Sequence, residues 1–207
     1  MAQMTIKHVE VLVEEPSAEA ALRLLLPRIL GAISFRVYPH QCKDELLQRL
    51  ADRLRGYASW LPETWRVVII LDQDDDDCAE LKQRLENIAQ QAGLATRSRP
   101  RRDRFAVVNR LAIEELEAWY FGDWKAVQKA YPRVNANVPA QARFRFPDSI
   151  TGGTWETFER VLRKAGYFKT GLRKIETARA VAEHMDPMRN TSPSFRALRT
   201  ALAEMVP

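Results

Sequence analysis

The sequence predicts an α/β fold with a mostly parallel central sheet flanked by helices, followed by a helical C-terminal extension. Two observations predict it: strand-like and helix-like segments alternate along the first 123 residues, and residues 66–71, RVVIIL, form a continuous apolar run. Such a run is typical of a strand buried on both faces of a parallel sheet. The alternation of elements favours β-α-β crossovers, which keep neighbouring strands parallel.

The first elements alternate regularly. A run rich in β-branched residues predicts a strand over 5–13, and Ser17 is the expected N-cap of a helix over 18–30. A short strand over 35–38 follows. The segment 43–57 then carries its leucines at helical spacing and predicts an amphipathic helix.

The elements after the apolar run complete the predicted sheet. An acidic run, DQDDDD, comes directly after the strand, and Asp77 or Cys78 opens a helix that continues to residue 92. Two short strands are predicted over 94–97 and 105–109, and a helix with three glutamates is predicted over 113–121. The pattern changes after this point, because the remaining residues predict helices without further strands.

The predicted extension consists of helices around one irregular stretch. Helices are expected over 124–131, 154–165, 172–184 and 193–205, and Pro and Gly make the segment 134–153 irregular. We expect this part to pack on the sheet as a basic helical extension.

The charge is divided unevenly between these two parts. Residues 1–123 carry 17 Lys+Arg and 20 Asp+Glu, a net of −3, whereas residues 124–207 carry 15 and 7, a net of +8. An acidic part beside a basic part suggests cation chemistry in one and polyanion binding in the other. The alternative is that the basic residues are solvated helix faces.

Carboxylates follow two predicted strands at the point where each strand ends. Glu14 comes after the first strand, and Asp72 and Asp74 come after the apolar run. Ligands of open α/β sheets bind outside the carboxyl ends of the strands, so we expect these three side chains to meet there. Carboxylates that meet repel one another unless a cation joins them. Oxygen ligands without Cys or paired His select Mg²⁺ or Mn²⁺, the ions of phosphodiester chemistry.

Other charged residues near these positions have simpler interpretations. Asp75, Asp76 and Asp77 suit the first turn of a helix, where negative charge is favoured. Lys43 follows the second strand and could contact a phosphate or lie on the surface.

The basic part contains candidate nucleic-acid contacts. Lys169, Arg173 and Lys174 border two glycines, and we predict that they contact a nucleic-acid backbone.

A Glu after the first strand and an Asp-x-Asp after a later strand resemble the TOPRIM domain of topoisomerases, primases and the overcoming-lysogenisation-defect nucleases. A resemblance over nearly the whole chain is closer still. The segments VEEPSAEAALRLLLPRIL, LDQDDDDCAELKQRLE, AIEELEAWYFGD and NTSPSFRAL are similar to the domain-of-unknown-function family 4276. That family is regarded as TOPRIM-like and is often encoded beside ATPases in phage-defence settings.

The resemblance implies a function and further site residues. It implies a Mg²⁺- or Mn²⁺-dependent TOPRIM-type nuclease active in phage defence, with Glu14, Asp72 and Asp74 as its catalytic and metal-binding residues. It also favours Glu117, and after it Glu114, as metal ligands. These two glutamates share a face if 113–121 is one helix; the alternative is a solvated acidic turn.

One departure from the family pattern bears on activity. The family usually reads V-E-G-P-S, and here Glu15 replaces the glycine, so that it either crowds the site or adds a carboxylate. The alternative function is therefore a non-catalytic or conditionally active subunit that partners an ATPase, and an oligomer is compatible with either.

The composition also bears on localisation. The two cysteines fit a reducing cytoplasm, and the longest apolar stretch is too short and too charged to cross a membrane.

Overall fold

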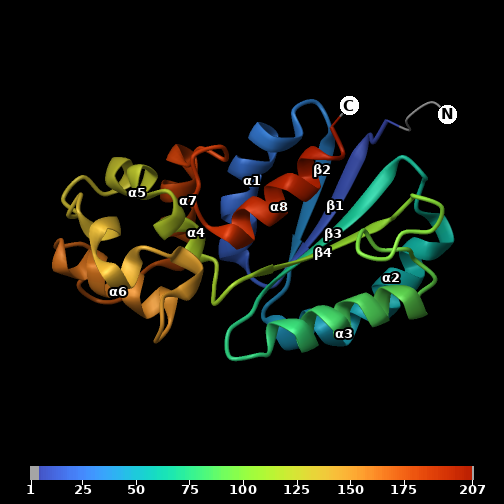
Figure 1. The fold of residues 1–207 in the computed structure, drawn as a ribbon, viewed down its shortest axis with the longest axis horizontal. Coiled ribbons are helices and arrows are strands. Elements are labelled where there is room, and N and C mark those ends of the chain that lie inside the picture. Colours follow the sequence, from blue (N-terminus) through green and yellow to red (C-terminus); the bar gives the residue numbers. More distant parts are fainter. Residues whose placement is uncertain (1–4, 207) are drawn as a thin grey trace.

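The structure, a computed structural model, describes residues 5–206 and is built on one parallel sheet (Figure 1). The strands are β1 (His8–Val13), β2 (Ser34–Pro39), β3 (Trp65–Asp72) and β4 (Val107–Ala112). They lie in the order β2-β1-β3-β4, and every neighbouring pair is parallel. A helix connects each strand to the next along the chain, as parallel pairing requires. The predicted α/β class with a parallel central sheet is confirmed.

Helices cover both faces of the sheet and extend beyond one end of it. They are α1 (Pro16–Leu30), α2 (Lys43–Trp60), α3 (Cys78–Gln91), α4 (Glu117–Gly122), α5 (Trp124–Ala130), α6 (Thr154–Lys164), α7 (Lys174–His184) and α8 (Pro193–Ala203). In Figure 1, α1 and α8 lie on one face, α2 and α3 lie on the other, and α5 and α6 lie beyond the carboxyl ends of the strands. None of the helices within residues 5–206 is both long and apolar enough to cross a membrane.

The register of the two central strands brings their carboxyl ends to the same edge. Val13, the last residue of β1, pairs with Ile70 of β3. Side chains of β1 alternate between the layers, because Val9 and Val11 join the core beneath α1, whereas Leu12 joins the core beneath α2 and α3. The carboxyl-terminal halves of both central strands are therefore apolar, and polar side chains follow at the point where the strands end.

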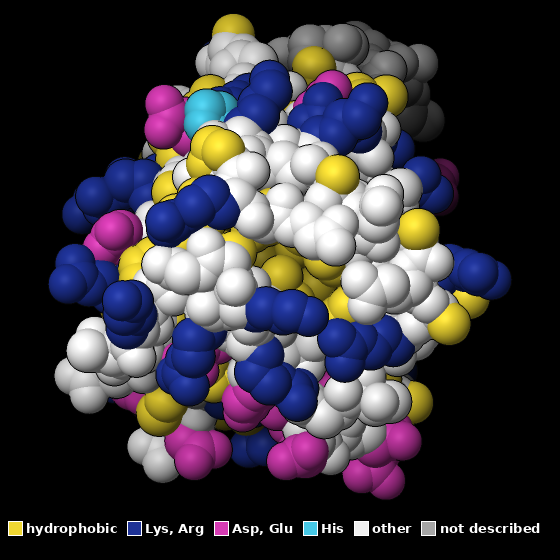
Figure 2. Space-filling model, turned by 90° about the vertical axis from the view of Figure 1, so that its left-hand side faces the viewer, with side chains coloured by type: hydrophobic (Ala, Val, Ile, Leu, Met, Phe, Trp, Pro, Cys, Tyr) yellow, Lys and Arg dark blue, Asp and Glu magenta, His cyan; other side chains and the backbone are white. Residues whose placement is uncertain are grey.

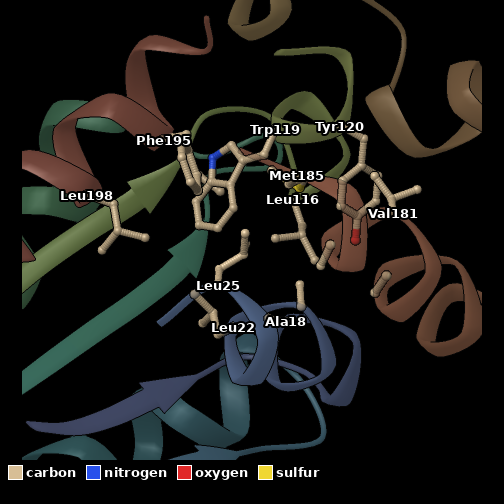
Figure 3. Packing of buried hydrophobic residues seen from close by; sticks show 14 of the residues in the cluster. Ala18, Leu22, Leu25, Leu116, Trp119, Tyr120, Val181, Met185, Phe195 and Leu198 are labelled. Carbon is tan, nitrogen blue, oxygen red and sulfur yellow. The ribbon is translucent and has the colours of Figure 1, made fainter. Parts of the chain in front are cut away.

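The C-terminal helices share a hydrophobic core with the first helix. Figure 3 shows Leu22 of α1, Trp119 of α4 and Phe195 of α8 within one packed cluster. The helix α7 packs along α1. Arg28 of α1 also donates hydrogen bonds of 2.7–2.9 Å to three backbone carbonyls at the end of α7. The core on this face of the sheet thus continues from the first helix into the last ones.

Two predicted features of the N-terminal part are wrong. The predicted strand over 94–97 does not form, since Thr96 makes only isolated bridges and its hydroxyl is bound to the buried carboxylate of Glu86. Ser17 does not cap the first helix. That helix begins one residue earlier, at Pro16, whose fixed φ suits the first helical position, and the Ser17 hydroxyl donates to the carboxylate of Glu15.

The predicted helix over 113–121 is also wrong in its first half. The helix begins only at Glu117, and Glu114 lies in the preceding turn with φ 59°. The Glu114 carbonyl accepts a hydrogen bond of 2.8 Å from the backbone of Asp74. This contact between two loops holds residues 113–116 out of a helix, although their composition favours one. Glu114 and Glu117 therefore do not share a helix face.

A matched pair of glycines tests the packing between α4 and the turn before α8. A Cβ on Gly122 would overlap the buried Asn190 side chain and lie 2.9 Å from the Ser192 nitrogen, whereas a Cβ on Gly56 within α2 meets nothing within 4 Å. We expect Gly122→Ala to lower the free energy of unfolding by about 1–3 kcal/mol through overpacking. Gly56→Ala should raise it by roughly 0.5–1 kcal/mol through helix propensity. Urea denaturation of both variants measures the difference, and equal stabilities would contradict this packing.

Candidate functional site

Glu14 and Asp72 meet at the carboxyl edge of the sheet, as their positions after β1 and β3 predict. The backbone N–H of Asp72 donates a hydrogen bond of 3.2 Å to Glu14 Oε2. Burial raises the pKa of the Glu14 carboxyl to about 7, and the charge of Asp74 acts in the same direction. Burial and the charges of Glu14 and Glu117 raise the pKa of Asp72 well above its usual value. These carboxylates are thus close enough to disfavour one another's charge.

Asp74 belongs to the same group but is held by a lysine. Lys43 Nζ, at the start of α2, lies 2.6 Å from an Asp74 carboxylate oxygen and 2.8 Å from one of Asp76. Asp74 also adopts φ 49°, a left-handed conformation that Asp tolerates better than most residues. Lys43 therefore bridges two carboxylates of the acidic loop, residues 73–77 between β3 and α3, rather than lying free on the surface.

Glu117 is the most deeply buried carboxylate of the group. It is the first residue of α4, its exposed fraction is 1%, and its Oε2 has no hydrogen-bond partner within the described residues. Burial raises its pKa to about 8, against the opposing effect of the Lys174 ammonium. The hydroxyl of Tyr120, one turn further along α4, is likewise buried without a partner among residues 5–206. Unpaired buried polar atoms are rare in folded proteins and point to a missing ligand or water.

The neighbouring glutamates divide between the edge of the site and a structural role. Glu114 lies in the turn beside the acidic loop and is partly exposed. Glu115 Oε2 accepts hydrogen bonds from the Thr154 hydroxyl at 3.0 Å and from the Trp155 backbone at 2.7 Å. Glu115 therefore binds the start of α6 and joins the sheet domain to the extension. No sequence signal indicated this interaction, because its partners lie about 40 positions away.

Lys174 lies beside the carboxylates rather than on a separate basic surface. Its Nζ is 3.7 Å from a Glu15 carboxylate oxygen and 5.1 Å from the centre of the Trp155 ring. The negative charges of Glu117 and Glu15 raise the pKa of Lys174 against the opposite effect of its burial. Glu15 thus adds a carboxylate to the site and is matched by a lysine from α7. Of the other predicted nucleic-acid contacts, Arg173 and Lys169 are both exposed, and Arg173 pairs with Glu176.

The face that adjoins the carboxylates is strongly basic. All of the +8 excess of the C-terminal part falls within residues 124–179, which contain 12 Lys+Arg and 4 Asp+Glu. Figure 2 shows the end of the molecule that contains α5 and α6, where Lys and Arg side chains spread over the surface around a hollow with a hydrophobic floor. A polyanion approaching the carboxylates from this end would meet positive charge first.

The donor chemistry of the site fits a hard divalent cation. Glu14, Asp72 and Glu117 offer carboxylate oxygens, whose mutual repulsion and whose unpaired buried oxygen a cation would relieve. Within residues 5–206, no three His, Cys, Asp or Glu side chains are already arranged as a metal-binding group. Binding would therefore require these side chains to turn toward a common centre.

The raised carboxyl pKa values make metal-free stability dependent on pH. Between about pH 5 and pH 8 the folded protein holds protons on Glu14 and Glu117 that the unfolded chain has released, so stability falls as the pH rises. We expect the Tm in EDTA to drop by at least about 2–4 °C over this range, which corresponds to roughly 1 kcal/mol for a chain of this size. Calorimetry measures the slope.

Two variants locate the origin of this slope. The glutamine of Glu117→Gln cannot ionise, so this variant should show a smaller change of Tm with pH. Glu80→Gln, at an exposed position of α3, should show the same change as the wild type. Mn²⁺ added at the upper pH should restore the Tm of the wild type, because a ligand of the folded state stabilises it. A wild-type Tm that is constant over the range would contradict the electrostatic account.

Comparison with known proteins identifies the family of this chain. Residues 13–203 match the family described as "Domain of unknown function (DUF4276)". No curated protein and no solved structure matches the chain. The match includes the end of β1, all of the carboxylates described above and the C-terminal helices through α8. The chain belongs to the DUF4276 family.

Proposed function

We propose that this protein is a Mg²⁺- or Mn²⁺-dependent nuclease of the TOPRIM type that cleaves nucleic-acid phosphodiesters in phage defence. The observation that carries the proposal is the buried, unpaired carboxylate oxygen of Glu117 beside Glu14 and Asp72. A Glu directly after β1 and an Asp-x-Asp that begins at the last residue of the adjacent parallel strand β3 are also the features of the TOPRIM resemblance. The phage-defence role rests on that resemblance alone.

The residues of the site have distinct roles in this proposal. A bound Mg²⁺ or Mn²⁺ supplies positive charge at the phosphate and lowers the pKa of water. Asp72, Asp74 and Glu117 would hold the ion, with Glu114 at the edge of the site. Glu14 would act as a further ligand or accept the proton of the attacking water.

Positive side chains would bring the substrate to these carboxylates. A bare group of carboxylates repels a phosphate backbone, so catalysis needs cations nearby. Lys174 lies directly beside the group and would contact the phosphate closest to it, while Lys169 and Arg173 would contact phosphates further along the strand. The basic segment 124–179 would supply the more distant attraction.

Cleavage assays with single-residue variants test the proposal. We expect the purified protein to cleave DNA or RNA with Mn²⁺ or Mg²⁺ and to lose activity in EDTA. Asp72→Asn, Glu14→Gln and Glu117→Gln should each lower the rate by roughly 100-fold or more, a loss of about 2.7 kcal/mol of transition-state stabilisation. Asp75→Asn is the matched control, because Asp75 lies in the same loop and is exposed. Equal activity in Asp72→Asn and the wild type would exclude this site.

The salt dependence of binding tests the basic residues separately. In EDTA, we expect Lys169→Ala combined with Arg173→Ala to weaken binding to duplex DNA of any sequence and to reduce the slope of log K against log salt. The reduction should be about 0.9 for each phosphate that the variant no longer neutralises. Arg23→Ala is the control, since Arg23 lies outside the basic segment, in α1, and is paired with Glu19 at 2.7 Å. An unchanged slope in the double variant would show that these two cations are only a solvated face.

A second candidate function is a conditionally active subunit that partners an ATPase. The interaction that favours it is the Glu15–Lys174 pair, which already places a cation against the carboxylates. Metal binding without cleavage by the isolated chain, together with copurification with a neighbouring ATPase, would support this alternative. Cleavage by the isolated chain would exclude it.

A further inference from the structure

A pocket lies toward the amino-terminal ends of the strands, away from the carboxylates. It is open and has a volume of about 560 Å³, and its lining includes His8, Glu10, Arg36, Arg53, Trp60 and Trp65. His8 and Trp65 are the first residues of β1 and β3 and lie opposite each other in the register. Because a strand rises about 3.3 Å per residue, the six residues of β1 place the His8 end of this pocket roughly 20 Å from Glu14.

The pocket presents aromatic rings to solvent. Trp60, at the end of α2, has an exposed fraction of 53%. Its ring meets Trp65 edge-to-face with centroids 5.8 Å apart, and Trp65 in turn lies 4.1 Å from the ring of His8. An indole that is held by neighbouring rings while much of its surface remains open is well suited to stacking.

The two arginines of the pocket have no acidic partner among residues 5–206. Arg53 lies 4.2 Å and Arg36 5.0 Å from the centre of the Tyr38 ring, and neither forms an ion pair with a carboxylate of the described residues. The one carboxylate that lines the pocket, Glu10, is buried and accepts hydrogen bonds from Tyr57 at 2.7 Å and from His8 at 2.8 Å. Two guanidinium groups therefore remain available to an anion.

We propose that this pocket binds a nucleotide unit of single-stranded nucleic acid. The base stacks on Trp60, and Arg36 and Arg53 contact its phosphates. Stacked aromatic rings beside unpaired cations are the combination by which proteins bind single strands without reading their sequence. A peptide without acidic side chains would satisfy the aromatic surface but gives no reason for two unpaired arginines. The proposal concerns binding only and does not require that the distant carboxylates cleave.

The helix α2 connects the pocket to the carboxylates. Its first residue, Lys43, forms an ion pair with Asp74 of the acidic loop, and its last residue, Trp60, lines the pocket. A single strand that follows this helix would reach both places, since 18 helical residues extend about 27 Å. The pocket would then anchor a strand whose other part lies near Glu14.

Fluorescence anisotropy with labelled oligonucleotides of about 12 nucleotides tests the proposal. The measurement uses the full chain in EDTA, so that binding is read without cleavage. We expect single-stranded DNA and RNA to bind more tightly than a duplex of equal length, because stacking requires an unpaired base. Trp60→Ala and the double variant Arg36→Ala, Arg53→Ala should each weaken binding by roughly tenfold or more. The double variant should also reduce the salt slope by about 0.7 for each phosphate that it no longer neutralises.

Matched controls separate this site from other causes. Met188→Ala removes an apolar side chain that is 74% exposed elsewhere, and Arg55→Ala removes an arginine of α2 that is paired with Asp52. Both should bind as the wild type does. Because binding is read in EDTA without cleavage, failure of the nuclease proposal leaves this inference standing. Unchanged affinity in Trp60→Ala and in the double arginine variant, or preference for duplex, would overturn it.

Discussion

The electrostatics of the site depend on the repulsion among the carboxylates of Glu14, Asp72 and Glu117. Parallel pairing of β1 and β3 places the first two at one edge of the sheet, and α4 places the third beside them. Burial prevents water from screening these charges, and the carboxyl pKa values rise as a result. Lysines then approach from two sides: Lys43 from α2 and Lys174 from α7.

The two lysines are positioned by different parts of the structure. Lys43 begins the crossover helix that packs beneath β1, so its position is determined by the sheet itself. Lys174 begins α7, which packs along α1 and depends on the C-terminal core. The hydrogen bonds between Glu115 and the start of α6 tie the same two regions together. The electrostatics of the site therefore depend on the extension as much as on the sheet.

The sequence predicted the sheet and its acidic edge because both follow from short-range patterns. A buried parallel strand reads as a continuous apolar run, so Asp72 could be placed at its end, and Glu14 at the end of the neighbouring strand, without coordinates. The turn at Glu114 could not be predicted, since the segment has helical composition and only the backbone hydrogen bond from Asp74 holds it open. The pairing of Lys174 with Glu15 joins residues about 160 positions apart, and no local pattern indicates such a pair. The roles of the site residues in metal binding remain predictions.

The packing of α7 on α1 also has a consequence for synthesis of the chain. The apolar face of α1 includes Leu22, Leu25 and Leu26, all fully buried in the folded protein, yet the helix that covers part of it ends only at His184. At a translation rate of roughly 5–20 residues per second, α1 emerges about 8–30 s before that partner. During that interval the part of this apolar face that α7 covers in the folded protein has no partner from α7.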